Sequence, residues 1–305
     1  MADLSALPPA PVSLEQKRPT PRTGRRFSVG PSLALLPFLG YVLVFLVVPT
    51  VTVVAGAFQS DGGPTLDNIR ALGSDAALTA LWKSVVLSGV SALLGAFLGG
   101  LLAYLIVTLP EPSLVRRIVL SVCGVLAQFG GVALAFAFIA TIGFTGVLTE
   151  ALRNGPGVEI FGSGWLYGLP GLIVVYTYFQ IPLMVIVFLP ALQGLQSQWR
   201  EAAVNLGAST CQYWTQVGLP LLTPAFLGST LLLFANGFAA YATAAALVSQ
   251  GAVILPLLIR QALTSEILLG QANLAYALAL EMIVVVSVVM LAYGLLLRRT
   301  SRWLR

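Results

Sequence analysis

The sequence predicts an all-α membrane protein with six membrane-spanning helices. Of its 305 residues, 58% are hydrophobic and only 9% are charged, and the mean hydropathy is +0.93. Soluble domains have an apolar content of roughly 45–50%. A helix needs roughly 20 residues to cross about 30 Å of hydrocarbon while satisfying its own backbone hydrogen bonds. Six apolar stretches are long enough: residues 33–57, 84–108, 118–142, 168–190, 225–247 and 273–297.

Residues 1–30 differ in composition from the rest of the chain. They hold five basic residues and five prolines without apolar periodicity, so they bury too little surface to become ordered. We expect a disordered basic tail here, followed by one six-helix domain over residues 31–305. The run at 33–57 is too long for the apolar part of a signal peptide and is taken as the first span.

The basic residues predict the orientation of the spans. With an even number of spans, both termini lie on one side of the membrane. If that side is the cytoplasm, twelve of the 16 basic residues are cytoplasmic and four face out, as the positive-inside rule requires. The four are Arg70, Lys83, Arg153 and Arg260, and the twelve are Lys17, Arg18, Arg22, Arg25, Arg26, Arg116, Arg117, Arg200, Arg298, Arg299, Arg302 and Arg305.

Small residues recur along one face of the second span. Ser91, Gly95 and Gly99 are spaced by four residues, which places them on the same side of a helix. Small side chains in membrane helices let another helix approach closely. We therefore expect tight helix packing along this stripe.

The polar loop before the fifth span, residues 197–220, begins with a predicted short helix. Ser197 can cap this helix, which we expect to run through Leu206. Glu201 lies near its N-terminal end, where a carboxylate is favoured. Gly207 is expected to end the helix.

A second short helix is predicted in the same loop. Ser209 and Gln212 have the spacing of a capping box, so the helix is expected to start there and continue to about Val217. Gly218 and Pro220 are expected to stop it.

The loop also carries a longer motif at fixed spacing. Glu201-Ala202-Ala203 is followed after three residues by Gly207, and nine residues later by Val217-Gly218-Leu219-Pro220. In this motif the chain resembles the permease subunits of bacterial ATP-binding-cassette (ABC) importers, whose EAA signature has isoleucine in place of Val217. The loop also stands between the fourth and fifth of six spans, as in that family. The resemblance implies a type I, MetI-like importer permease in the bacterial inner membrane.

The resemblance implies what the loop does and which partners it needs. Residues 197–220 would form a cytoplasmic coupling loop that docks on an ATPase and passes its nucleotide-driven closure to the spans. The implied partners are a cytoplasmic ABC ATPase dimer that uses ATP and Mg²⁺, a second and different permease subunit, an extracytoplasmic solute-binding protein and membrane lipid, with no nucleic acid. The implied coupling residues are Glu201, Ala202, Ala203, Gly207, Tyr213, Trp214, Leu219 and Pro220.

A simpler hypothesis is an amphipathic helix lying at the membrane surface. It would explain Tyr213 and Trp214, because aromatic side chains favour headgroup depth. It does not explain the small residues Ala202 and Ala203 beside Gly207, or the fixed spacing of the motif.

The composition disfavours several classes of enzyme. Histidine is absent, and Cys123 and Cys211 lie far apart, so zinc sites, haem sites and imidazole catalysis lack their usual groups. The two lysines, Lys17 and Lys83, do not stand in a Walker A sequence, which binds ATP phosphates. We expect this chain to bind no metal and no ATP, and to have no catalytic residue. The spans also lack the paired carboxylates or nucleophile–base pair of a membrane-embedded enzyme.

Polar residues in the spans are candidates for a solute path. Gln128, Gln180 and Asn236 are each expected about halfway across the membrane, where transporters commonly bind their solutes. The same amides could instead form hydrogen bonds between helices. Tyr176 and Tyr241 could line the same route or simply pack.

Glu281 lies within the sixth span, where a carboxylate costs roughly 2.5–3.5 kcal/mol on insertion scales. It therefore needs a partner, such as Arg260 or Lys83, or a place in the path as a contact for a cation. Residues 252–259 resemble the polyamine-type permeases, so we expect a small charged organic solute, with spermidine or putrescine first.

Two alternatives stay open. Iron, thiamine and phosphonate permeases of the same family share this length and loop. An ion-gradient-driven secondary transporter would use Glu281 as its ion site.

Overall fold

The structure, a computed structural model, describes residues 29–60, 62–110, 113–157, 164–248, 254–264 and 272–300. The tail expected at residues 1–30 falls outside these ranges except for its last two residues. The chain divides into two compact units, residues 1–49 and 50–305, and each is described by itself.

The predicted all-α class with six spans is confirmed. By length and composition, six helices in the described part of the chain could cross a membrane. They are Leu35–Ala57, Asp75–Thr108, Gly131–Asn154, Leu169–Gln193, Thr210–Ala239 and Asn273–Leu295.

The first unit contains α1 (Val29–Val42) and a π-helix, η1 (Leu43–Val47), and α2 (Val48–Ala57) starts at its end. Pro49 follows η1 by two residues. Proline has no N–H, and its ring collides with the carbonyl group four residues earlier. The wider π turn accommodates both effects without ending the helix.

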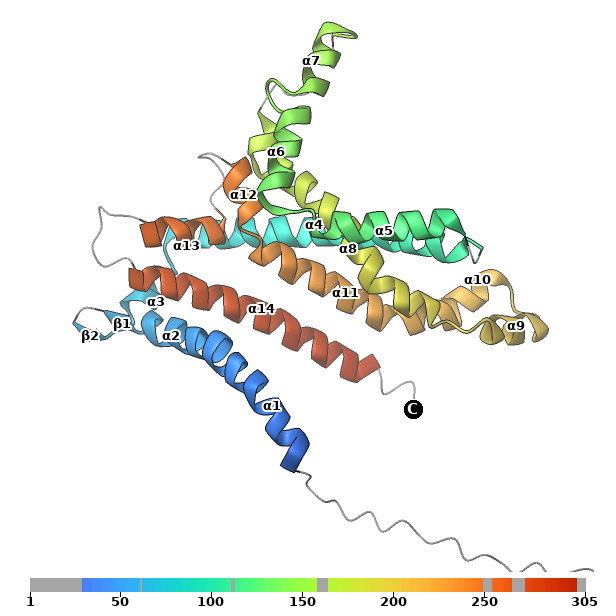
Figure 1. The fold of residues 1–305 in the computed structure, drawn as a ribbon, viewed down its shortest axis with the longest axis horizontal. Coiled ribbons are helices and arrows are strands. Elements are labelled where there is room, and N and C mark those ends of the chain that lie inside the picture. The colour runs from blue at the N-terminus through green and yellow to red at the C-terminus, as the bar shows by residue number, and fades with distance from the viewer. Residues whose placement is uncertain are drawn as a thin grey trace, which may run out of the picture. The chain divides into compact units, whose positions relative to one another are not determined.

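The second unit is built around α4 (Asp75–Thr108). Ser74 Oγ accepts a hydrogen bond from the Ala77 N–H at 3.4 Å, so α4 begins well before the apolar run at 84. α4 packs against α8 (Leu169–Gln193), α11 (Leu219–Ala239) and α13 (Leu255–Thr264), and α14 (Ala272–Thr300) packs against α11 and α13 (Figure 1).

Shorter elements connect these helices. They are β1 (Gln59–Ser60) paired with β2 (Gly63–Pro64), α3 (Asp67–Ala71), α5 (Leu114–Gln128), α6 (Gly131–Ile142), α7 (Val147–Asn154), η2 (Trp165–Tyr167), α9 (Ser197–Asn205), α10 (Thr210–Tyr213), the π-helix η3 (Trp214–Gly218) and α12 (Ala242–Leu247).

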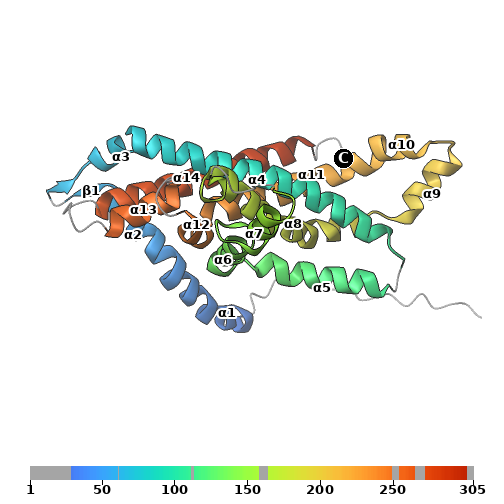
Figure 2. The same ribbon diagram turned by 90° about the horizontal axis from the view of Figure 1, so that it is seen from above.

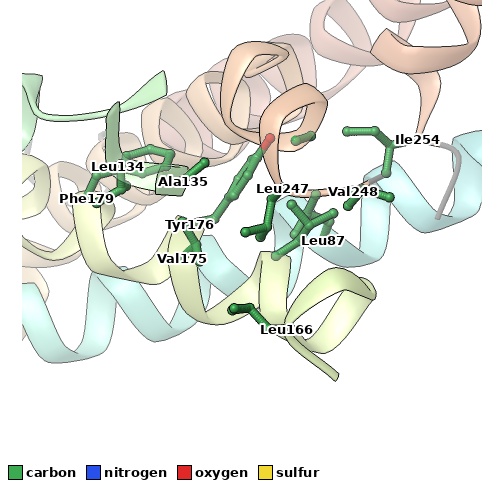
Figure 3. Close-up of a cluster of buried hydrophobic side chains, with 12 residues drawn as sticks. Leu87, Leu134, Ala135, Leu166, Val175, Tyr176, Phe179, Leu247, Val248 and Ile254 are labelled. Carbon is green, nitrogen blue, oxygen red and sulfur yellow. The ribbon is translucent and has the colours of Figure 1, made fainter. Parts of the chain in front are cut away.

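Among the described residues of the second unit, three clusters of buried apolar side chains form the core, and α4 contributes to each of these three. Leu87 belongs to the first, which joins α4 to α6, α8 and α12 (Figure 3). Ala92 and Ala96 belong to the second, with α5, α8 and α11. Ala77 belongs to the third, with α11, α13 and α14.

A close helix approach lies along the predicted small-residue stripe. A Cβ atom placed on Gly99 would lie 2.5 Å from the Ile181 carbonyl oxygen and 2.6 Å from Met184 Cβ, and one placed on Gly95 would lie 2.7 Å from Gln180 Cβ. Real Cβ atoms do not approach other atoms so closely. The contact of α4 with α8 therefore requires glycine at both positions.

The third predicted span, 118–142, is wrong in its bounds. α5 ends at Gln128, Gly130 is extended, and α6 begins at Gly131 with φ +70°. Two consecutive glycines allow this break at little conformational cost. The candidate span is consequently Gly131–Asn154, which joins α6 to α7.

The fifth predicted span, 225–247, is also displaced. The helix is continuous from Thr210 to Ala239, so the predicted stop at Gly218 and Pro220 does not occur. η3 ends at Gly218, two residues before Pro220, which repeats the arrangement of η1 and Pro49. At the other end the helix stops before Ala240, and α12 is separate.

We predict that Gly99→Ala lowers the thermal stability of the purified chain, because the added methyl group meets the backbone of α8. Overpacking of this kind typically costs about 1–3 kcal/mol. Gly89→Ala on the same helix is the matched control, because a Cβ atom there meets nothing within 4 Å. It should be neutral or stabilising by up to about 1 kcal/mol. Equal melting temperatures for the two variants in detergent would contradict the tight contact.

Candidate functional site

The loop at 197–220 lies at one end of the second unit. α9 and α10 extend past the bundle there, whereas α3 and the β1–β2 pair lie at the opposite end (Figures 1 and 2). The start of α5 and the C-terminal part of α14 point to the same end as α9 (Figure 2). Arg116, Arg117 and Arg200 therefore share one end of the bundle.

The first helix of the loop, α9, ends as predicted at Gly207. Its N-cap is Gln196 rather than Ser197, and no side chain caps it. Gly207 has φ +80°; its N–H donates to the Val204 carbonyl, and the Ala208 N–H donates to the Ala203 carbonyl, both at 2.9 Å. This is a Schellman motif. The Schellman motif explains the spacing of the EAA signature. Its two hydrogen bonds fix the residue with positive φ, here Gly207, four residues after Ala203.

α9 has no buried residue. Glu201 and Ala202 are exposed and Ala203 is half-buried. Three apolar side chains of this loop were missed by the sequence analysis: Leu206, Val204 and Trp199 are 88%, 62% and 39% exposed. Their exposure could have been predicted from the sequence, because apolar residues in a loop outside the spans have no helix bundle to pack against. They give α9 an apolar, accessible surface.

The second helix of the loop is anchored at its start and continues into the membrane. The predicted capping box is confirmed: the Gln212 N–H donates to Ser209 Oγ at 3.3 Å, and the Ser209 N–H donates to Gln212 Oε1 at 2.7 Å. From there the chain stays helical to Ala239. α10, η3 and α11 thus form one rod.

Tyr213 and Trp214 face the bundle rather than the free surface of the loop. Tyr213 is 5% exposed, and the Trp214 ring lies edge-on to Tyr104 of α4, with centroids 5.5 Å apart. Leu219 and Pro220 are exposed. Trp214 also borders an apolar groove of about 340 Å³ between α4, α8 and α11. These aromatic contacts tie the loop to α4.

The predicted path residues differ in their burial. Gln180 is fully buried, and its Nε2 donates to Ser91 Oγ at 3.1 Å. Gln128 and Asn236 are exposed. Tyr176 is fully buried in the first core cluster (Figure 3).

Two helix breaks lie side by side, and the sequence analysis did not foresee this. A Cβ atom on Gly131, at the start of α6, would lie 3.7 Å from Ala242 Cβ at the start of α12. The Tyr176 hydroxyl donates to the Ala240 carbonyl at 2.5 Å, so it satisfies an acceptor freed where α11 ends. The Arg260 guanidinium lies over the Tyr241 ring, 5.9 Å from its centroid. Polar groups thus gather around the two breaks.

Glu281 is half-buried on α14. Its Oε2 atom is buried and has no hydrogen-bond partner among the described residues. Neither of the predicted partners is shown to pair with it, and Arg260 instead lies over Tyr241. Part of the stretch at 252–259, which suggested a polyamine, lies outside the described residues.

Comparison with known proteins identifies relatives of the chain. Residues 95–302 match the family model described as "Binding-protein-dependent transport system inner membrane component". The sulfate transport system permease protein CysW of Escherichia coli (strain K12) is 25% identical over 209 residues, which are 68% of this chain and 66% of CysW.

Two further relatives are longer than the matched region. The ferric transport system permease protein FbpB of Actinobacillus pleuropneumoniae is 25% identical over 71% of this chain and 31% of FbpB. The thiamine transport system permease protein ThiP of Haemophilus influenzae is 28% identical over 50% of this chain and 27% of ThiP. The chain thus spans just under two thirds of CysW and less than a third of the other two.

Solved structures share the fold. A bacterial ABC transporter for import of the acidic polysaccharide alginate has a chain with a TM-score of 0.74 at 21% identity, covering 89% of this chain and 96% of that one. The inward-facing MetNI methionine ABC transporter gives a TM-score of 0.56 at 18% identity, covering 73% and 95%. These matches confirm the predicted type I architecture.

We predict that Gly207→Val destabilises the end of α9, because a β-branched residue resists positive φ at a cost of about 1–2 kcal/mol. Gly207→Asn is the matched control, since asparagine tolerates this conformation better. The measurement is hydrogen exchange of the amides at 204–208 in the full-length chain. Equal protection in the two variants would show that the Schellman motif does not hold the loop.

Proposed function

Because this chain belongs to the binding-protein-dependent transport system inner membrane components, the permeases of ABC importers, we propose that it couples ATP hydrolysis by a partner ATPase to solute uptake. The coupling element is the loop at 197–220. One observation carries this proposal: a nine-residue helix without a buried residue leads through Gly207 into a helix of 30 residues that enters the bundle.

α9 is the surface that meets the ATPase. Its exposed side chains combine a carboxylate, Glu201, with the apolar Trp199, Val204 and Leu206. An exposed helix with apolar anchors is suited to a groove on a partner protein. We assign ATPase contact to this surface, together with Ala202 and Ala203.

Tyr213 and Trp214 have a different role in this proposal from the one implied by the resemblance. Tyr213 is buried and Trp214 packs on Tyr104, so a displacement of the loop moves α4 together with α11. Leu219 and Pro220 continue the same rod. These residues transmit the movement rather than receive it.

The loop end of the bundle is the cytoplasmic end in this proposal. Arg116, Arg117 and Arg200 gather there, which agrees with the positive-inside rule. α14 also runs toward that end (Figure 1). The chain is then a multi-pass protein of the bacterial inner membrane with both termini in the cytoplasm.

The proposed complex contains a cytoplasmic ABC ATPase dimer, a second permease subunit that differs from this chain, and an extracytoplasmic solute-binding protein. The chain has no Walker A sequence, so ATP and Mg²⁺ belong to the ATPase. The solved alginate transporter is in complex with an alginate pentasaccharide-bound periplasmic protein, which supports a binding protein as a partner.

The solute path runs beside the paired breaks of α5–α6 and α11–α12. Irregular backbone at membrane depth is tolerated where it is buried in protein or lines a water-filled cavity, and interrupted helices form the solute sites of many transporters. Gln128, Asn236 and Tyr241 lie at or near these breaks, and Arg260 contacts Tyr241. They are the path candidates best supported by position.

The solute is proposed to be small and charged. Polyamine stays a prediction that rests on Glu281 and a short apolar stretch. The relatives named above are permeases for sulfate, ferric iron and thiamine. Membership of the importer family favours ATP-driven uptake over an ion-gradient-driven transporter.

We predict that Glu201→Lys weakens ATPase binding while the chain still inserts into the membrane, because the change reverses a charge on the exposed face of α9. The measurement is the amount of ATPase that co-purifies with the tagged permease. A loss of about tenfold corresponds to ~1.4 kcal/mol. Glu150→Lys on α7 is the control, as it makes the same charge change on another exposed helix. Equal ATPase retention in both variants would contradict the docking surface.

We predict that Cys211 reacts with a membrane-impermeant maleimide only from the cytoplasmic side, because it is exposed in the loop whereas Cys123 is buried. Labelling should occur in inside-out vesicles and not in intact spheroplasts, with the chain expressed without its ATPase. Cys211→Ser should abolish it. Labelling of Cys211 in spheroplasts would reverse the proposed orientation.

A further inference from the structure

The π-helix η3 determines which side chain of the loop faces α4. The Leu219 N–H donates to the Trp214 carbonyl, five residues earlier, so this turn is one residue wider than an α-helical turn. In an α-helix, residues four apart share a face, whereas residues five apart lie about 140° apart around the axis. An α-helical turn here would therefore align Thr215 with Leu219, and the π turn aligns Trp214 with it instead.

The apolar groove between α4, α8 and α11 reflects this alignment. Its lining includes Trp214 of η3 together with Leu219 and Phe226 of α11. Thr215 is instead exposed, and its hydroxyl donates to the Cys211 carbonyl on its own helix at 2.9 Å. The π turn thus gives the side that faces α4 an indole ring in place of a hydroxyl group.

Gly218 leaves the space that this indole ring occupies. A Cβ atom on Gly218 would lie 2.6 Å from Trp214 Cε3 and 3.0 Å from Trp214 Cζ3. The same ring lies edge-on to Tyr104 of α4 and to Tyr213, with centroids 5.5 Å and 5.8 Å away, a favourable arrangement of aromatic rings. Because the ring contacts all three residues, a side chain at position 218 must displace it.

The glycine at position 218 has no other evident role. It was expected to stop the helix, but the helix continues through it to Ala239. Glycine within a helix is less stable than alanine, because it loses more conformational freedom on folding. The contact with the Trp214 ring is a reason for glycine at this position.

We propose that Gly218 is a positioning residue that, with the π turn, holds Trp214 against Tyr104, so that a displacement of α9 reaches α4 through this ring contact. The proposal rests on the proposed function, because the displacement comes from an ATPase docked on α9. It adds Gly218 to the coupling residues and gives the π turn a function.

Three native tryptophans lie along the proposed route and can report on it. Trp199 is exposed on α9, Trp214 is in η3, and Trp82 is exposed near the start of α4. Trp82 lies about 33 Å along α4 from Tyr104. The full-length chain is labelled with fluorotryptophan for fluorine NMR, and each resonance is assigned by its loss when that tryptophan is replaced by phenylalanine.

The first test uses the labelled chain alone in lipid nanodiscs. Gly218→Ala should move the Trp214 resonance and leave those of Trp82 and Trp199 in place, because the added methyl group meets only the Trp214 ring. Gly124→Ala on α5 is the matched control, since a Cβ atom there meets nothing within 4 Å, and it should move none of the three. An unmoved Trp214 resonance in Gly218→Ala would overturn the proposal.

The second test separates transmission from a merely structural role. The unlabelled ATPase and second permease are added, and spectra are recorded with and without ATP. In the wild-type chain, Trp199 should respond to the ATPase and Trp82 to ATP. Gly218→Ala and Tyr104→Leu should each keep the Trp199 response and lose the Trp82 response. The double variant should behave as either single variant does, because both changes break the same contact.

The outcomes distinguish this proposal from the proposed function. If Trp199 does not respond to the ATPase in the wild-type chain, docking on α9 fails and the role of Gly218 fails with it. If Trp199 responds but Trp82 does not respond in the wild-type chain, or responds equally in Gly218→Ala, only the role of Gly218 is overturned. Docking on α9 then still stands.

Discussion

The contact between α4 and α8 is the constraint on which the rest of the second unit depends. Water drives no association between helices in lipid, so close packing and interhelical hydrogen bonds must hold them together. Gly95 and Gly99 allow the backbone of α8 to lie directly on α4, and Gln180 and Ser91 add a hydrogen bond inside this contact. Because α4 also contributes to every buried cluster, the positions of α11, α13 and α14 follow from this one interface.

Interrupted helices create a second constraint, because each break frees backbone groups that lipid cannot satisfy. In the structure, residues close to each break accommodate the interrupted backbone. At the end of α11 the Tyr176 hydroxyl donates to the Ala240 carbonyl, and at the start of α6 Gly131 supplies the positive φ of +70°. The two breaks are adjacent. Tyr176, predicted as a candidate for the solute path, donates the hydrogen bond that satisfies the Ala240 carbonyl.

Some local signals in the sequence were read correctly, whereas the N-cap expected at Ser197 and the stop expected at Gly218 and Pro220 are absent. The capping box at Ser209 and the helix end at Gly207 depend on a few neighbouring residues, and both predictions are confirmed. The break at Gly130 was missed because an apolar run was counted without regard to two consecutive glycines. Continuity through Pro220 was missed because a π turn can absorb a proline. The all-α class with six spans needed only composition and length, whereas the type I architecture was predicted from the resemblance in the EAA motif.

In the candidate site, too, features set by neighbouring residues could be predicted from the sequence, whereas features set by helix packing could not. The spacing of Glu201, Ala203 and Gly207 is set by one helix end, so the motif could be recognised from sequence. The burial of Gln180, in contrast to the exposure of Gln128 and Asn236, depends on which face of each helix meets its neighbouring helices. An apolar span carries almost no periodicity to reveal that face, because lipid and protein interior are both apolar.

The unbroken rod from Thr210 to Ala239 has a geometric consequence. At 1.5 Å per residue, its 30 residues measure about 45 Å, which exceeds the hydrocarbon thickness of a bilayer. A tilt of roughly 5° about one end would carry the other end about 4 Å. A small rotation of this helix at one membrane surface would therefore displace its other end by more than the width of a water molecule. No hinge within the helix is required.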